Sequence, residues 1–163
     1  MSADVIIRPA RPEDREALIE QFLGLNVHEE AISRDRRTDR AGAIDSLDAA
    51  DRKVEKSNGY RLVAERGGKI VGHVFLTFQS HAIFVREEKR PYAYVSELFV
   101  REEARGLGIG KALLAEAERL AIGRGAGDLM IGVLVGNESA ERAYARFGFR
   151  PYACELIKEL KRQ

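Results

Sequence analysis

Seven residues, RGLGIGK at positions 105–111, hold three glycines between an apolar run and a segment with helical spacing. Glycine weakens the interior of both helices and strands, so this density indicates a loop that needs backbone freedom. A loop that leads from a strand into a helix directs backbone amides at whatever lies before the helix, where the helix dipole is positive. Such a place binds anions, most often phosphate. The stretch therefore predicts a strand–loop–helix unit with a candidate anion site.

The rest of the chain predicts an α/β fold around this unit. Short runs rich in β-branched and aromatic residues predict strands, and apolar residues at helical spacing predict helices. The predicted strands span 4–10, a hairpin over 60–79 that turns at Gly67 and Gly68, 92–100 and a buried run at 128–135, and the predicted helices span 12–30, part of 31–58, 111–125 and 137–149. Residues 152–160, YACELIKEL, fit a strand and an amphipathic helix equally well. This order predicts one domain over residues 1–163 with a mixed sheet.

Charge and composition narrow the range of partners. The 27 basic and 26 acidic residues leave a net charge of +1, which gives no electrostatic reason to expect nucleic acid or an anionic membrane as the partner. No apolar run approaches the roughly 20 residues that span a bilayer, and the first residues lack a secretory signal pattern, so we expect a cytoplasmic protein. Cys154 is the single cysteine, and we expect it to be inert and partly buried. His28 and His81 have no partner at metal spacing, so no metal site is predicted.

Two common phosphate-binding loops fail on spacing. A P-loop needs a glycine five residues before its Gly-Lys pair and a Ser or Thr after it. Arg105 and Ala112 occupy these two places. The dinucleotide fingerprint G-x-G-x-x-G would begin at Gly106, but Lys111 stands where its third glycine belongs. Nucleotide binding through either motif is therefore disfavoured.

Arg105, Gly108 and Gly110 instead satisfy the pattern Arg-x-x-Gly-x-Gly, which resembles the coenzyme A pyrophosphate loop of the Gcn5-related N-acetyltransferase (GNAT) family. The whole of VSELFVREEARGLGIGKALLAEAERLA (95–121) is similar to the central strand, loop and helix of that family. NESAERAYARFGF (137–149) resembles its N-x-x-A-x-x-x-Y-x-x-x-G-F helix. The two ends, IIRPARPED and YACELIKEL, are also similar, so the resemblance covers nearly the whole chain.

The resemblance implies a fold, a reaction and a cosubstrate. It implies a single N-acetyltransferase domain whose mixed, mostly antiparallel sheet is flanked by helices on both faces. It implies direct transfer of an acetyl group from acetyl-coenzyme A to a primary amine, without a metal. Pantetheine would lie between the splayed strands 96–100 and 130–135 and pair with the main chain of Leu98 and Val100. The implied contacts to coenzyme A are Leu98, Phe99, Val100, Arg105, Gly106, Leu107, Gly108, Ile109, Gly110, Lys111, Asn137, Ala140 and Tyr144.

Two residues are candidate catalysts. Tyr144 matches the tyrosine that the family uses as the acid for the coenzyme thiolate, although its helical position also fits a core aromatic. Glu97 is the candidate general base, because strands of this kind rarely carry a charge at a central position. Glu97 also fits a solvated face or a group that only orients the amine, and Ser96 departs from relatives with two adjacent acids. Asn137 fits a coenzyme contact and a helix N-cap equally well.

The acceptor amine is not fixed by these residues. The resemblance implies an acceptor pocket built from residues 29–56, 81–92 and 151–160. Acidic side chains there fit either a cationic amine or a solvated surface: Glu29, Glu30, Glu87 and Glu88. We favour a small-molecule amine, with a protein N-terminus or lysine, or a non-catalytic acyl-coenzyme A sensor, as alternatives. His73 is expected to be structural. The resemblance leaves a homodimer open, because many relatives are dimers, but no apolar patch of the sequence is clear enough to predict one.

Overall fold

The computed structural model describes residues 4–161, which form a five-stranded sheet in the order β1-β2-β3-β4-β5. Neighbours from β1 to β4 pair antiparallel, and β5 pairs parallel with β4. The predicted α/β class and the mixed, mostly antiparallel sheet are therefore confirmed. The strands are β1 (Val5–Pro9), β2 (Tyr60–Arg66), β3 (Lys69–Ser80), β4 (Pro91–Val100) and β5 (Asp128–Ile131).

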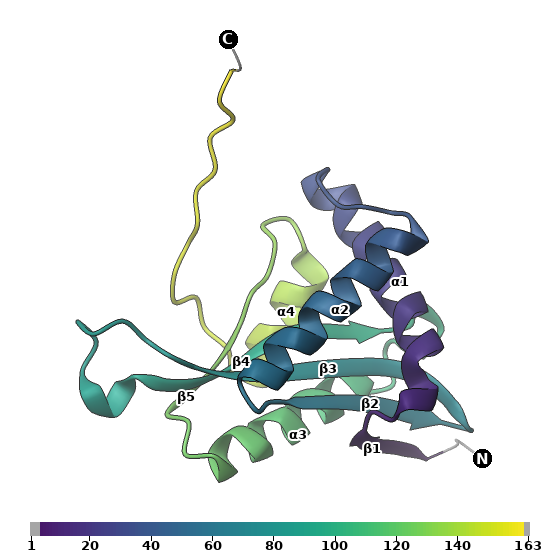
Figure 1. The fold of residues 1–163 in the computed structure, drawn as a ribbon, viewed down its shortest axis with the longest axis horizontal. Coiled ribbons are helices and arrows are strands. Elements are labelled where there is room, and N and C mark those ends of the chain that lie inside the picture. Colours follow the sequence, from purple (N-terminus) through teal and green to yellow (C-terminus); the bar gives the residue numbers. More distant parts are fainter. Residues whose placement is uncertain (1–3, 162–163) are drawn as a thin grey trace.

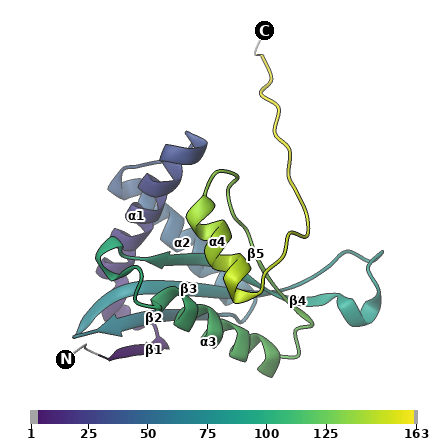
Figure 2. The ribbon, with the colours of Figure 1, turned by 180° about the vertical axis from the view of Figure 1, so that it is seen from behind.

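Helices cover both faces of this sheet, as the resemblance implies. α1 and α2 lie together on one face, and α3 and α4 lie on the other (Figures 1 and 2). No helix within residues 4–161 is long and apolar enough to cross a membrane. The helices are α1 (Arg15–Ser33), α2 (Arg40–Lys56), α3 (Ile109–Gly123) and α4 (Glu138–Phe147), with short 3-10 turns at Pro12–Asp14, Glu87–Lys89 and Glu102–Ala104.

Two apolar clusters, one on each face of the sheet, hold the layers together. The cluster beneath α1 and α2 contains the buried side chains of Phe22, Leu47 and Phe75. The cluster beneath α3 contains the buried side chains of Leu76 and Leu113. Burial of one such side chain contributes about 1.5–3 kcal/mol, so a few of them fix each helical layer on the sheet.

The ends of α4 lie where the sequence predicts them. Asn137 is the N-cap, and its Oδ1 accepts a hydrogen bond from the amide of Ala140 at 3.4 Å. Gly148 ends the helix with a φ of +116°, a left-handed conformation that favours glycine at this position. The cap confirms the N-cap interpretation of Asn137, and its contact with coenzyme A stays a prediction.

Three predictions near the C-terminal end of the chain are wrong. β5 stops at Ile131, so residues 132–135 of the predicted buried strand leave the sheet, and Val135 is 84% exposed. Residues 150–161, here called the C-terminal segment, form neither a paired strand nor a helix and run away from the domain (Figure 1). Cys154 lies in this segment and is exposed. Apolar content predicted burial, but a strand also needs a hydrogen-bonding neighbour, which these segments lack within the described chain.

His73 of β3 is fully buried, which confirms its expected structural role. Its Nδ1 lies 2.8 Å from Oε1 of Gln21, whose Nε2 donates to the carbonyl of Ile70 at 3.0 Å. Because an amide oxygen is an acceptor, this network assigns the proton to Nδ1. The imidazole stacks on Phe22 and lies beside Phe99, at centroid distances of 4.9 Å and 6.2 Å. Burial lowers the pKa of His73 to about 3, so the ring is neutral at physiological pH.

We expect His73 to make the free energy of unfolding fall in acid. The pKa of His73 is about 3 in the folded chain and 6.5 as a free side chain, so below pH 6.5 the unfolded chain binds a proton that the folded chain does not. This contribution to stability is lost at about 1.4 kcal/mol per pH unit as the pH falls from 6.5 towards 3. Denaturant unfolding of the wild type and of His73→Asn, at pH 7 and pH 5, measures it.

The quantity to compare is the difference between the two proteins, because subtraction removes the titrations that they share. The wild type should be the more stable protein at pH 7, and its advantage should shrink by about 2 kcal/mol at pH 5. An advantage that does not change with pH would contradict a buried, neutral imidazole at this position.

Candidate active site

β4 and β5 separate after four paired residues. Their parallel pairing runs from Tyr92 opposite Asp128 to Val95 opposite Ile131. Beyond this point β4 continues to Val100 along β3, whereas the chain after Ile131 leaves the sheet. A cavity of about 1020 Å³ opens at the separation, a size at the upper end of small-molecule sites.

A β-bulge in β4 decides which side chains face this cavity. Phe75 of β3 lies opposite Glu97, while the next residue lies opposite Val95, so Ser96 is the extra residue. The bulge reverses the alternation of the strand, because Val95 and Leu98 both pack on the α3 side of the sheet. Glu97 therefore shares the α1 side with Phe99, and it lines the cavity instead of a solvated face.

The environment of Glu97 favours its neutral form. Burial and, to a smaller extent, the nearby carboxylate of Glu29 raise the pKa of Glu97 to about 7, against a minor opposing effect of Lys53. Desolvation disfavours a charge, and a like charge adds to that effect. Glu97 is thus a carboxyl group that exchanges a proton near neutral pH, which is the property of a general base or acid.

Tyr144 reaches the same cavity from α4. Its ring packs edge-on against Phe149 at 6.0 Å, and part of it contacts the cluster beneath α3. Burial and the charge of Glu29 raise the pKa of Tyr144 to about 12, so its hydroxyl stays protonated at neutral pH. The ring packs on the core, as one interpretation of Tyr144 predicts, and the residue also lines the cavity; its role as the acid stays a prediction.

The edge of β4 that faces the separation carries main-chain groups with no strand beside them. The amide of Arg101 donates to Val71 of β3 at 2.9 Å. Because strand residues present their backbone groups to alternate edges, Phe99 also faces β3, whereas Leu98 and Val100 face the separation. The carbonyl of Val100 accepts a hydrogen bond from Nε of Arg105 at 3.1 Å. Arg105 therefore fastens the glycine loop to the end of β4.

The glycine loop forms the floor of the cavity at the start of α3. Gly106 and Gly108 have φ values of +77° and +78°, a region that favours glycine over all other residues. The first bond of the helical ladder joins the amide of Ala112 to the carbonyl of Gly108. The amides of residues 109–111 therefore have no helical partner and lie at the positive end of the dipole. Of the predicted loop residues, Leu107 alone does not line the cavity and is half exposed.

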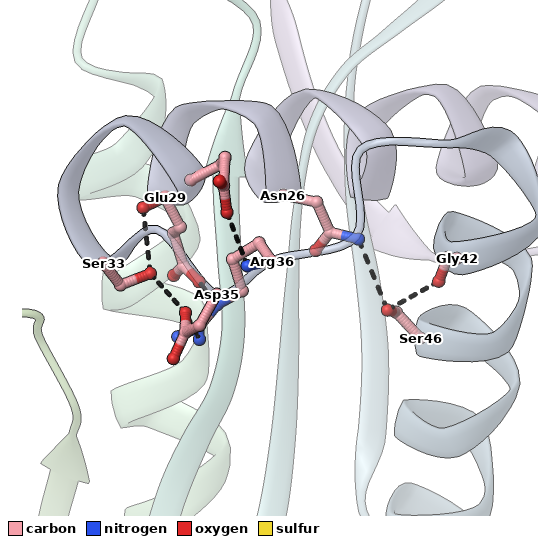
Figure 3. A network of polar contacts seen from close by, with 8 residues as sticks. Asn26, Glu29, Ser33, Asp35, Arg36, Gly42 and Ser46 are labelled. Atoms are coloured by element: carbon pink, nitrogen blue, oxygen red, sulfur yellow. Dashed lines mark hydrogen bonds and ion pairs between the residues drawn. The ribbon is translucent and has the colours of Figure 1, made fainter. Parts of the chain in front are cut away.

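One side of the cavity is formed by α1 and the loop after it, and of its residues the sequence analysis identified only Glu29. Leu25, His28 and Glu29 line the cavity from α1, and Arg36 lines it from the following loop. Glu29 and Arg36 lie close together (Figure 3). Nε of Arg36 donates a hydrogen bond to the carboxylate of Glu29 at 2.7 Å. Glu30 bonds the amide of Arg36 at 2.6 Å and so shapes this loop.

A sequence signal for this side of the cavity exists. Leu18, Phe22, Leu25 and Glu29 follow one another at spacings of four, three and four residues, which is one face of a helix. A carboxylate that continues an apolar face has to lie at the edge of the core, where a cavity can begin. Glu87 and Glu88, the other acidic candidates of this kind, are exposed on a 3-10 turn outside the cavity lining.

The cavity joins four chemical capabilities. Glu97 can accept a proton near pH 7, Tyr144 can donate one, the loop amides can bind an anion, and the β4 edge can pair with an extended polar ligand. Within residues 4–161, no group of three or more His, Cys, Asp and Glu side chains is arranged to hold a metal ion. This arrangement suits proton-assisted transfer of a group from an anionic, extended carrier.

Comparison with known sequences agrees with this chemistry. A profile of the acetyltransferase (GNAT) family matches residues 25–149. A mycothiol acetyltransferase from Streptomyces bingchenggensis is 37% identical over 119 residues, which are 71% of this chain and 36% of that protein. A mycothiol acetyltransferase from Streptomyces coelicolor is 34% identical over 119 residues, which are again 71% of this chain and 36% of that protein. The chain thus spans about a third of the length of these curated relatives.

Solved structures share the fold at lower identity. A mutant protein from Bacillus halodurans has a TM-score of 0.82 at 21% identity, over 96% of this chain and 99% of that one. An aminoglycoside 6′-N-acetyltransferase from Acinetobacter haemolyticus, in its apo form, has a TM-score of 0.71 at 14% identity, over 97% of this chain and 99% of that one. Likeness at these identities establishes the fold.

We expect the replacement of Glu97 by Gln to stabilise the protein as the pH rises. The pKa of Glu97 is about 7 in the folded chain, above 4.5 for the free side chain, so its ionisation between these values weakens the folded state. The amide of Gln carries no charge at any pH. The difference in unfolding free energy between Glu97→Gln and the wild type should therefore move in favour of the variant by about 1–3 kcal/mol from pH 5 to pH 8. An unchanged difference would show that Glu97 is not buried as described.

Proposed function

This chain belongs to the acetyltransferase (GNAT) family, and from that premise we propose that it transfers an acetyl group from acetyl-coenzyme A to the primary amine of a small molecule. One observation carries the proposal. Glu97, Tyr144 and the glycine loop all line a single cavity at the place where β4 and β5 separate. A base on β4, an acid on α4 and an anion site at the start of α3 are thus gathered around one volume.

The residues of the cavity fit coenzyme A. The unpartnered amides at the start of α3 suit its diphosphate, and Lys111 adds a positive charge beside them. The backbone of Leu98 and Val100 along the free edge of β4 suits the amides of pantetheine. When bound, acetyl-coenzyme A supplies the acetyl group as an activated thioester. Arg105 acts mainly by holding the loop against Val100, which is a positioning role.

Glu97 and Tyr144 divide the proton transfers. Glu97 takes the proton that the amine nitrogen loses as its bond to the acetyl carbon forms, and its pKa of about 7 suits this work near neutral pH. Tyr144 gives its hydroxyl proton to the sulfur as the carbon–sulfur bond breaks, and its pKa of about 12 keeps that proton in place beforehand. No acyl-enzyme is needed, because the amine attacks the thioester directly.

Carboxylates on one side of the cavity favour a cationic acceptor there, whereas Arg105, Lys111 and Arg146 also line the cavity and suit the anionic coenzyme. Glu29 and Glu155 line the cavity together with Glu97, and the guanidinium of Arg36 is already paired with Glu29. An amine that arrives protonated gains favourable interactions with these carboxylates and releases its ammonium proton to water before it attacks, which leaves Glu97 free to take the second proton as the bond forms. The names of the relatives, mycothiol acetyltransferase and aminoglycoside 6′-N-acetyltransferase, refer to small molecules, which supports a small-molecule acceptor for this chain.

We expect Gly108→Ala to weaken the binding of acetyl-coenzyme A by tenfold or more. Gly108 has a positive φ and lies in the cavity lining, where an added Cβ meets no protein atom within 4 Å and so intrudes on the ligand space. Gly125→Ala is the matched control, because Gly125 has a φ of +74° and equally open surroundings but lies outside the lining. Both variants should lose about 1–2 kcal/mol of stability through backbone strain. Equal affinities by calorimetry would contradict the assignment of the loop.

The proposal itself is tested by coenzyme A release across a panel of polyamines, amino acids, aminoglycosides and peptides. We expect turnover with one small-molecule class and a loss of about 10²–10⁴ in kcat/KM for Glu97→Gln and for Tyr144→Phe, with acetyl-coenzyme A still bound. The wild-type rate should rise with pH through about 7 as Glu97 ionises, and Glu97→Gln should lack this rise. Glu88→Gln, an exposed carboxylate outside the cavity, is the control.

Two outcomes would overturn parts of the proposal. Turnover on peptides alone would replace the small-molecule acceptor by a protein. Binding of acetyl-coenzyme A without turnover on any amine would indicate a non-catalytic module. The thiol assay has to be run with Cys154→Ser or a matched blank, because the exposed Cys154 thiol reacts with the same reagents.

A further inference from the structure

The polar contacts at the end of α1 form a network that borders the cavity (Figure 3). Nε of Arg36 donates a hydrogen bond to the carboxylate of Glu29 at 2.7 Å, and its Nη1 donates to the carboxylate of Asp35. The hydroxyl of Ser33 donates to Asp35 as well. The guanidinium of Arg36 is therefore held between two carboxylates, and the Glu29–Arg36 ion pair has a fixed place beside the cavity.

The backbone of the loop between α1 and α2 helps to keep this ion pair in place. Arg34 caps α1 with a φ of +59°, and its amide donates to the carbonyl of Glu30. The carboxylate of Glu30 accepts a hydrogen bond from the amide of Arg36 at 2.6 Å. At the other end of the loop, Asp39 caps α2 by accepting a hydrogen bond from the amide of Gly42 at 3.3 Å. The fold of the loop thus positions Arg36 at Glu29.

Partial burial distinguishes this ion pair from a neighbouring one on the same loop. The side chains of Arg36 and Glu29 are 32% and 26% exposed. Arg37 pairs with Asp45 at 2.6 Å, but these side chains are 57% and 67% exposed and lie outside the cavity lining. Water screens exposed charges strongly and shielded charges less. The charges of Glu29 and Arg36 therefore act on groups across the cavity, whereas those of Arg37 and Asp45 are screened.

Glu97 faces charged groups from every element around the cavity. After burial, which is the main cause, Glu29 on α1 raises the pKa of Glu97 and Lys53 on α2 lowers it. Tyr94, on β4 itself, also interacts electrostatically with Glu97. The other titratable groups that line the cavity are His28 on α1, Arg105 and Lys111 at the start of α3, Tyr144 and Arg146 on α4, and Glu155 in the C-terminal segment. After burial, Glu29 raises the pKa of Tyr144 too, so its charge acts on both the candidate base and the candidate acid.

We propose that the Glu29–Arg36 ion pair sets the pH range in which Glu97 accepts the proton of the attacking amine, a role that rests on the proposed function. Both residues act through Glu97, so they are positioning residues. The negative charge of Glu29 favours the protonated form of Glu97. The positive charge of Arg36 cancels part of this effect, because opposite charges in a hydrogen-bonded pair largely neutralise each other's field at a distance. Arg36 therefore limits how far Glu29 moves the titration of Glu97.

The two halves of the ion pair are expected to act in opposite directions. Glu29→Gln removes the negative charge, so Glu97 should ionise at a pH about 0.5–1 unit lower than in the wild type. Arg36→Met leaves the charge of Glu29 without its partner, so Glu97 should ionise at a pH about 0.5 unit higher. Arg36→Lys keeps the positive charge and should titrate close to the wild type. A purely structural role predicts the same direction for Glu29→Gln and Arg36→Met, because both variants break the same hydrogen bond.

Carbon-13 NMR titration of the Glu97 carboxyl group measures these shifts on the full chain, with neither acetyl-coenzyme A nor an amine added. The signal of Glu97 is identified by its absence from Glu97→Gln. The pH dependence of kcat/KM for coenzyme A release is the second readout, and its rising limb should move in the same direction as the NMR titration for each variant. Circular dichroism establishes that each variant is folded.

Two exposed ion pairs supply the matched controls. Arg37→Met removes a positive charge from the same loop, and Glu16→Gln removes a negative charge from α1, where Glu16 pairs with Arg40 at 2.6 Å. Neither residue lines the cavity. Each control changes the net charge of the protein as its test variant does, but screening should keep the titration of Glu97 within about 0.2 unit of the wild type.

Three results would overturn the proposal. They are a Glu97 titration that is unchanged in Glu29→Gln, one that moves in the same direction in Glu29→Gln and Arg36→Met, and a shift of equal size in the controls. The NMR titration needs no turnover. Absence of coenzyme A release with every amine would therefore contradict the proposed function, while the titration would still decide whether the ion pair controls Glu97.

Discussion

The end of hydrogen bonding between β4 and β5 determines where the other parts of the site are placed. After Val95 and Ile131 the two strands no longer share a ladder, and the free edge of β4 is left with donors and acceptors that need partners. Water or an extended ligand supplies them, so the separation is at once an interruption of the sheet and a binding surface. The bulge at Ser96 lies at the same point and turns Glu97 towards the opening. A single irregularity of the sheet thus provides the space, the polar edge and the titrating group.

Glu97 illustrates how stability and chemistry compete in this opening. A carboxyl group that remained in water would keep its ordinary pKa and would be a weak base at neutral pH. Burial, with the charge of Glu29 nearby, raises the pKa of Glu97 to about 7, so that the group is matched to proton transfer but weakens the folded state once it ionises. The neighbouring clusters on both faces of the sheet compensate, because their apolar burial does not change with pH.

Local sequence features predict the parts of this molecule that depend on local physics. Glycines that need positive φ, the Asn137 cap and the alternation of apolar residues suffice to locate the loop, α4 and most strands. Features that depend on distant partners escape such reasoning. Residues 132–135 are as apolar as a buried strand but have no neighbour to pair with, and the exposure of Cys154 follows from a segment that leaves the domain.

The residues of the candidate site fall into the same two groups, those that a local pattern identifies and those that depend on distant partners. The residues of the loop and of β4 are identified by a contiguous motif, whereas Leu25, His28 and Arg36 are not, because only the packing of α1 brings them to the cavity. Arg105 shows the same limit. Its predicted contact with coenzyme A stays a prediction, and the structure adds a hydrogen bond from its Nε to Val100, which depends on the path of the loop and which spacing does not reveal.

The contact between Phe99 and α1 makes the α1 side of the cavity more tightly packed than the α4 side. A Cβ on Gly24 would lie 2.8 Å from Cζ of Phe99, and His73 packs against the same ring. α1 and β4 are therefore in close contact there, with no space for a larger residue at position 24. Glu29 on α1 and Glu97 on β4 therefore belong to two elements that are packed tightly together. α4, which bears Tyr144, has no fully buried residue and contacts the cluster beneath α3 through the part-buried Tyr144 and Phe147, so it is held by fewer core contacts. Substitutions on α4 therefore change the width of the cavity at a lower cost in packing than substitutions at the contact of Phe99 with α1, and they leave the spacing of Glu29 and Glu97 unchanged.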